Sequence, residues 1–94
     1  MKKSYTYILA NKTRTVLYIG VTSDLKLRLI QHKNAEGSVF TTKYKVQDLM
    51  YFEEFSDINQ AIEREKQLKN WRREWKLRLI QSTNPEMKDL FQEF

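Results

Sequence analysis

The sequence predicts a single α/β (α+β) domain in which helices flank a three-stranded antiparallel β-sheet. Two segments rich in β-branched and aromatic residues and a third segment that alternates indicate the strands, and helical patterns follow the second and third of them. The 94 residues are too few for two hydrophobic cores, so we expect residues 1–94 to form one domain. With 40% apolar and 13% aromatic residues, the chain can pack a core.

The first two strands are predicted over residues 5–10 and 16–21 and form an antiparallel hairpin. Polar residues lie between them, which suits a tight connection. A turn centred on residues 12 and 13 would place Tyr7 directly opposite Tyr18, with both rings on one face of the sheet.

The middle of the chain is predicted to contain a helix, a loop and the third strand. The side chains of residues 22–24 can cap a helix that runs to about residue 33. Residues 34–45 are polar and are expected to form a surface loop. Residues 47–55 alternate well enough to form a strand.

The last part of the chain is predicted to be helical. A helix begins after Asp57, whose side chain can accept a hydrogen bond from the first turn. Trp71, Trp75 and Leu79 recur at helical spacing and predict a further helix that packs through these side chains. Both tryptophans are therefore expected in the core rather than as platforms for nucleic-acid bases.

One glutamate lies in the middle of the apolar face of the helix after Asp57. That face contains Ile58, Ala61, Ile62 and Leu68. Glu65 points toward its centre, whereas Glu63 points the opposite way. A carboxylate in this position needs an arginine, a lysine or a metal ion to compensate its charge. A structural ion pair with an arginine at the edge of the core explains Glu65 equally well when it is considered alone.

The composition restricts the partners and the metal chemistry. The 17 Lys and Arg residues exceed the 12 Asp and Glu residues, which suits contact with phosphates. The chain has no Cys and one His, which excludes thiolate zinc sites and leaves carboxylates as ligands for a hard metal ion. No apolar run approaches the ~20 residues that cross a bilayer, so we expect a cytoplasmic protein without membrane contact.

Basic residues in the second half of the chain are candidate contacts for nucleic-acid phosphates. They are Lys43 and Lys45 in the predicted loop and Lys69, Arg72, Arg73 and Lys76 around the last helix. An ordinary solvated helix face explains the charges of the last helix equally well.

An ordered set of motifs resembles the GIY-YIG nuclease superfamily. Tyr18-Ile19-Gly20 ends the second predicted strand, Arg28 follows, and Glu65 lies on a later helix. Residues 17–22, 25–32 and 61–69 are more narrowly similar to the small single-domain bacterial endonucleases of that superfamily.

The sequence departs from the motifs of the resembled superfamily in two places. Tyr5 and Thr6 precede Tyr7, where Gly and Ile give the superfamily its name, and Val21 lies where many members have a lysine or another polar residue. Tyr7 itself is retained.

The resemblance implies a metal-dependent DNA endonuclease that hydrolyses phosphodiester bonds, with a role in DNA repair or recombination. It implies that Arg28 binds the phosphate, that Glu65 binds Mg²⁺ or Mn²⁺, and that Gly20 lets the substrate approach the backbone. The expected partner is DNA, with no small-molecule cofactor, and a partner protein or self-association could supply targeting.

The resemblance also makes Tyr7 and Tyr18 the two motif tyrosines and places His32 at a position that is commonly His or Tyr. Tyr18 is our first choice for the residue that orients the attacking water, with Tyr7 and His32 as hydrogen-bonding partners or alternatives. Two other functions stay open. The chain could bind nucleic acid with little or no cleavage, or it could bind another protein, with Glu65 as a structural ion-pair partner.

Overall fold

The computed structural model describes residues 2–93, which form a three-stranded antiparallel sheet and the helices around it. The strands are β1 (Ser4–Ala10), β2 (Leu17–Thr22) and β3 (Asp48–Phe55), in the spatial order β2-β1-β3. The helices are α1 (Leu25–Lys33), α2 (Val39–Lys43), α3 (Ile58–Asn70), α4 (Arg73–Thr83) and the 3₁₀ helix η1 (Leu90–Glu93). The predicted fold class is confirmed. Across residues 2–93, no helix has the length and apolar character needed to span a bilayer.

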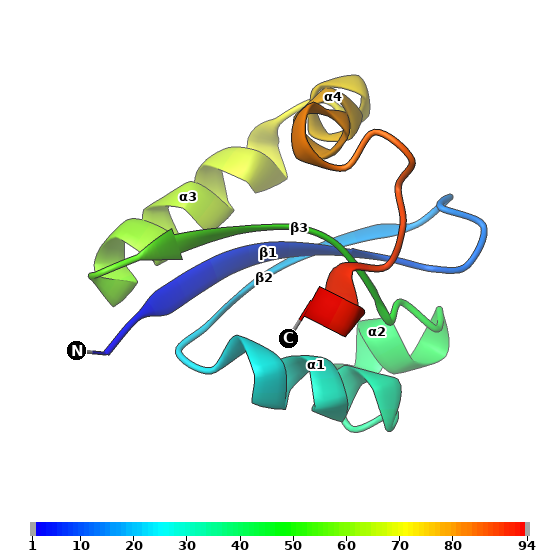
Figure 1. The fold of residues 1–94 in the computed structure, drawn as a ribbon, viewed down its shortest axis with the longest axis horizontal. Coiled ribbons are helices and arrows are strands. Elements are labelled where there is room, and N and C mark those ends of the chain that lie inside the picture. The colour runs from blue at the N-terminus through cyan, green and yellow to red at the C-terminus, as the bar shows by residue number, and fades with distance from the viewer. Residues whose placement is uncertain (1, 94) are drawn as a thin grey trace.

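Helices cover both faces of the sheet (Figure 1). Helices α3 and α4 lie over one face, and α1, α2 and η1 lie over the other. Because side chains alternate along a strand, the central strand β1 contributes to two cores. Tyr7 and Leu9 pack on the α1 side, and Ile8 and Ala10 pack on the α3 side.

The hairpin between β1 and β2 has a different register from the predicted one. Tyr7 pairs with Gly20, and Tyr18 pairs with Leu9, so the pairing is shifted by two residues. The prediction that Tyr7 lies directly opposite Tyr18 was therefore wrong. A shift by an even number keeps side chains on the same face, so the two tyrosines are diagonal neighbours on the α1 side.

The loop of the hairpin explains this register. The prediction assumed a two-residue turn, but the Asn11 N–H donates to the Val16 carbonyl at 3.3 Å and encloses a longer loop. The Asn11 side-chain oxygen also accepts the N–H groups of Thr15 at 2.9 Å and Val16 at 3.0 Å. Arg14 takes up a positive φ of 60° inside the loop. The asparagine side chain thus sets the loop length, and with it the register.

Helix α1 begins as predicted, whereas α2 lies inside the segment 34–45 that was predicted to be a loop. Asp24 caps α1 by accepting the Leu27 N–H at 3.1 Å. Ser38 caps α2 by accepting the Thr41 N–H at 3.2 Å. The prediction missed α2 because five residues, three of them β-branched, carry almost no helical periodicity.

The tryptophan repeat does not form one stripe on one helix, contrary to the prediction. Helix α3 ends at Asn70, and Trp71 has an extended backbone with ψ of 151°. Trp75 lies on α4 and is 43% exposed, whereas Ile80 is the buried residue of that helix. The two indoles meet edge to face with their centroids 6.2 Å apart. The break at Trp71 changes the helical phase, which the spacing alone could not reveal.

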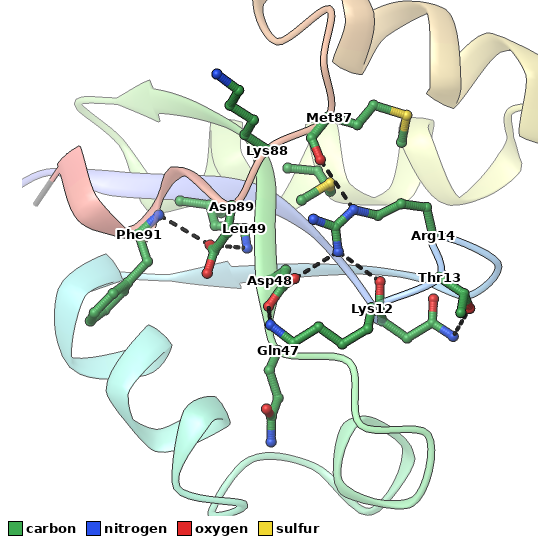
Figure 2. A network of polar contacts seen from close by, with 12 residues as sticks. Lys12, Thr13, Arg14, Gln47, Asp48, Leu49, Met87, Lys88, Asp89 and Phe91 are labelled. Atoms are coloured by element: carbon green, nitrogen blue, oxygen red, sulfur yellow. Dashed lines mark hydrogen bonds and ion pairs between the residues drawn. The ribbon is translucent and has the colours of Figure 1, made fainter.

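Polar contacts tie the hairpin loop and the C-terminal segment to β3 (Figure 2). The Asp48 side chain is 3% exposed, and its Oδ2 lies 2.6 Å from Nη1 of Arg14. Asp89 accepts the Leu49 N–H at 2.9 Å and pairs with Lys33 at 2.7 Å. Because Lys33 is the last residue of α1, these contacts fix the end of that helix on the sheet.

Candidate active site

A buried hydrogen bond joins β1 to α1. The Tyr7 hydroxyl lies 3.3 Å from Nε2 of His32, and the ring centroids are 6.1 Å apart. Tyr7 is 1% exposed and His32 is 2% exposed. Because both side chains are almost fully buried, the hydrogen bond holds the imidazole and the phenol against each other.

Gly20 makes room for the Tyr7 ring. A Cβ atom at Gly20 would lie 2.5 Å from the Tyr7 hydroxyl and 3.1 Å from the ring of Tyr18. Packed side chains do not tolerate contacts this short, so a larger residue would push the Tyr7 hydroxyl away from His32. Gly20 is itself buried, and the approach of a substrate to its backbone stays a prediction.

Three more of the predicted site residues act on the Tyr7 hydroxyl. Burial raises the pKa of Tyr7 above its ordinary value, and a hydrogen bond with Arg28 offsets part of this rise. Charge interactions with Tyr18 and Glu65 raise the same pKa further. Tyr7 is therefore a neutral phenol at neutral pH. Arg28, Tyr18 and Glu65 come from three different elements, and all three influence this one hydroxyl.

His32 is uncharged at neutral pH. Burial lowers its pKa, and the neighbouring Arg28 cation lowers it further, from 6.5 to about 4. The second ring nitrogen, Nδ1, lies 3.1 Å from the hydroxyl of Thr41 on α2. A neutral imidazole that faces a phenol can exchange a proton with it.

The two glutamates of α3 have different surroundings, as their helical phase predicted. The Glu65 side chain is 20% exposed, and its carboxylate lies 3.5 Å from Nζ of Lys69. Glu63 is exposed and lines a separate hollow with Arg64 and Gln67. The cation that compensates Glu65 is therefore a lysine of the same helix.

The chemistry of the donor groups fits a metal ion that binds together with a substrate phosphate. In residues 2–93, no group of three or more His, Asp or Glu side chains is arranged as a complete metal site. Mg²⁺ is often held by one or two carboxylates and takes its other ligands from phosphates and water. Glu65, whose charge acts on the Tyr7 hydroxyl, can supply that carboxylate.

Helix α2 adds a row of aromatic side chains that the sequence analysis missed. The ring of Phe40 stacks on Tyr18 with centroids 6.0 Å apart, and Tyr44 lies 4.8 Å from Phe40. Nζ of Lys43 lies 5.4 Å from the Tyr44 ring centroid. Phe40 and Tyr44 are 42% and 44% exposed. Their spacing of four residues was the available signal, since it places two side chains on one face of a helix.

A hollow of about 360 Å³ lies at the β2 edge of the sheet, next to this aromatic row. It is lined by Leu17, Tyr18, Ile19, Phe40, Lys69 and Lys76. Two of the predicted phosphate contacts, Lys69 and Lys76, therefore meet there with exposed aromatic surface. Cations beside aromatic rings are the usual surface for an unpaired nucleotide.

The other predicted phosphate contacts lie outside this hollow. Lys43 and Lys45 are exposed at the end of α2. Arg72 is exposed at the start of α4, and Arg73 donates to the carbonyl of Arg14 at 2.9 Å. Arg73 thus helps to hold the hairpin loop, and a role of these four residues in binding DNA stays a prediction.

Comparisons with known proteins identify related chains. A family model described as the GIY-YIG catalytic domain matches residues 3–78. A UPF0213 protein of Staphylococcus saprophyticus is 36% identical over 80 residues, which cover 85% of this chain and 96% of the relative. A UPF0213 protein of Clostridium perfringens is 38% identical over 79 residues, or 84% of each chain. The solution NMR structure of a UPF0213 protein from Bacillus halodurans aligns with a TM-score of 0.52 at 27% identity, over 83% of this chain and 82% of that one.

Proposed function

The chain belongs to the GIY-YIG family, and we propose that it is a metal-dependent DNA endonuclease. The observation that carries the proposal is the convergence of Arg28, Tyr18 and Glu65 on the buried pair of Tyr7 and His32. A cation, a carboxylate and a proton-accepting pair are the groups that phosphodiester hydrolysis needs at one place.

Arg28 and Glu65 serve to stabilise the negative charge that develops on the phosphoryl oxygens. Attack on a phosphodiester concentrates negative charge on the phosphoryl oxygens, which a guanidinium next to the Tyr7 hydroxyl is placed to stabilise. Glu65 would hold Mg²⁺ or Mn²⁺, and such an ion, when bound, acts as a Lewis acid on the same oxygens. Lys69 keeps Glu65 compensated when no ion is bound.

Tyr18, Tyr7 and His32 serve to orient the attacking water and to accept its proton. Tyr18 is half-buried and orients the attacking water. As the water oxygen bonds to phosphorus, its proton passes to the Tyr7 oxygen, and Tyr7 passes its own proton to Nε2 of His32. The leaving oxygen takes a proton from solvent. A bound phosphate offsets the charge of Arg28 that lowers the pKa of His32, so the imidazole becomes a stronger base when substrate binds.

The hollow at the β2 edge is the proposed contact surface for DNA. Lys69 and Lys76 would bind backbone phosphates, and the exposed ring of Phe40 would bind a base face. The hollow includes Tyr18, so DNA bound there reaches the site.

The test is incubation of the purified protein with single-stranded, duplex, flapped and branched DNA, with Mn²⁺ or with a chelator. Cleavage that requires the metal ion and falls strongly in Tyr18→Phe and Arg28→Ala supports the endonuclease. A role in repair or recombination predicts preferred cleavage of flapped or branched DNA. Salt-sensitive binding without cleavage of any substrate would refute the endonuclease and support a nucleic-acid-binding module.

The two glutamates of α3 give a matched pair of variants. Glu65→Gln should abolish Mn²⁺ binding measured by calorimetry, lower cleavage by at least about a hundredfold and preserve DNA affinity. Glu63→Gln removes the same charge from an exposed position and should change none of these values. Loss of Mn²⁺ binding in Glu63→Gln with normal binding in Glu65→Gln would contradict the assigned ligand.

A further inference from the structure

The side of His32 that faces away from Tyr7 is enclosed by the start of α2. Nδ1 of His32 lies 3.1 Å from Oγ1 of Thr41, which is 2% exposed. The same Oγ1 lies 3.1 Å from the Ser38 carbonyl and 3.1 Å from Oγ of Ser38. Both nitrogens of the imidazole are therefore engaged, one by β1 and one by α2.

The hydrogen bond that Thr41 donates to the Ser38 carbonyl indicates which nitrogen of His32 carries the hydrogen. The Thr41 hydroxyl has one proton, and the Ser38 carbonyl beside it can only accept a hydrogen bond. When Thr41 donates to that carbonyl, its oxygen lone pairs face Nδ1 of His32. Nδ1 must then carry a hydrogen and donate it to Thr41.

Counting protons around Tyr7 leads to the same tautomer. The Arg28 guanidinium acts on the Tyr7 hydroxyl but can only donate hydrogen bonds, so the Tyr7 proton needs another acceptor. Within residues 2–93, the structure gives it Nε2 of His32 at 3.3 Å. A hydrogen on Nε2 would leave the buried Tyr7 proton without an acceptor, which is costly.

Gly37 closes the enclosure around the imidazole. A Cβ atom at Gly37 would overlap Nδ1 of His32 and would lie 2.8 Å from Oγ1 of Thr41. The loop therefore passes so close to the imidazole that a side chain at this position has no space. Ser38, the next residue, accepts the Thr41 N–H as the cap of α2, so one turn both starts the helix and orients the Thr41 hydroxyl.

We propose that Thr41 is a positioning residue that holds His32 in the Nδ1–H tautomer, so that the bare Nε2 accepts the proton of Tyr7. The role in cleavage rests on the proposed function, because the proton path through Tyr7 belongs to it. The assignment of the tautomer does not rest on the proposed function. With Nε2 protonated, His32 could only donate to Tyr7, and the path would be closed. After proton transfer, Thr41 keeps the Nδ1–H of the imidazolium hydrogen-bonded inside the core.

The chain is well suited to a direct test, because it has a single histidine. Tag-free protein labelled with ¹⁵N-histidine gives two imidazole nitrogen signals, whose shifts report which nitrogen carries the hydrogen. The variants are Thr41→Val, which has nearly the same shape but no hydroxyl, and Thr41→Ser, which restores the hydroxyl. Thr42→Val is the matched control, since Thr42 is exposed and its hydroxyl lies 3.4 Å from the Ala35 carbonyl, away from His32.

The expected result is Nδ1–H in the wild type, Thr41→Ser and Thr42→Val, and a shift toward Nε2–H in Thr41→Val. Cleavage should fall about a hundredfold in Thr41→Val, with unchanged DNA affinity, and recover in Thr41→Ser. Nε2–H in the wild type, or an unchanged tautomer in a folded Thr41→Val, overturns the proposal. If Thr41→Val does not fold, Nε2–H in the wild type or in Thr41→Ser still overturns it. A wild type that cleaves no DNA refutes the proposed function instead, while the tautomer of each variant still decides what Thr41 does.

Discussion

Replacing His32 with glutamine should weaken the dependence of the protein's stability on pH. His32 is 2% exposed, and burial together with the Arg28 cation lowers its pKa from 6.5 to about 4. The chain has no other histidine, so His32 is the one imidazole whose protonation can contribute to the pH dependence of stability. Glutamine keeps a polar side chain near Tyr7 and Thr41 but does not titrate.

The magnitude follows from proton linkage. Between pH 6.5 and about pH 4, the unfolded chain carries a proton on His32 that the folded chain does not carry. Stability therefore rises with pH through this window, is fully present above pH 6.5 and is lost as the pH falls toward 4. The difference between the two pKa values corresponds to about 3 kcal/mol in the free energy of unfolding. That is a large part of the roughly 5–15 kcal/mol that holds a small domain folded.

The assay is urea unfolding of the wild type and His32→Gln at a series of pH values between 7.5 and 4. Acidic groups such as Asp89 affect both proteins alike. Burial opposes ionisation of Asp89, but Lys33 and backbone N–H groups outweigh burial and lower its pKa. The difference between the two stability curves isolates His32. Parallel curves would refute the depressed pKa, and a wild type that gains stability on acidification would refute its sign.

Two further experiments test the geometry of the site and the contact surface. Gly20→Ala should lower the free energy of unfolding by about 1–3 kcal/mol and break the hydrogen bond of Tyr7, because the new Cβ overlaps its hydroxyl; an unchanged melting temperature would contradict this packing. Changing Lys69 and Lys76 together to Ala should reduce the slope of log K against log salt for DNA by about two. Lys26→Ala, at an exposed position of α1, should leave affinity unchanged, and an equal loss there would show that the charge acts without a defined surface.

Much of the local structure could be predicted from the sequence, because its causes act over a few residues. Alternation marks the strands, the Asp24 side chain reaches the N–H of Leu27 in its own first turn, and helical phase separates Glu65 from Glu63. The resemblance to the GIY-YIG superfamily rested on the order of motifs along the chain, and the family match confirms it. The roles of the individual site residues stay proposals.

The tertiary structure decided the features that depend on contacts between distant residues. The Asn11 side chain closes the hairpin loop and pairs Tyr7 with Gly20, which the strand patterns alone do not specify. The contact between Thr41 and His32 requires the intervening loop to fold back over the imidazole. Sequence patterns report local preferences, whereas register, the place of a short helix and the protonated nitrogen of an imidazole depend on which atoms the whole fold brings into contact.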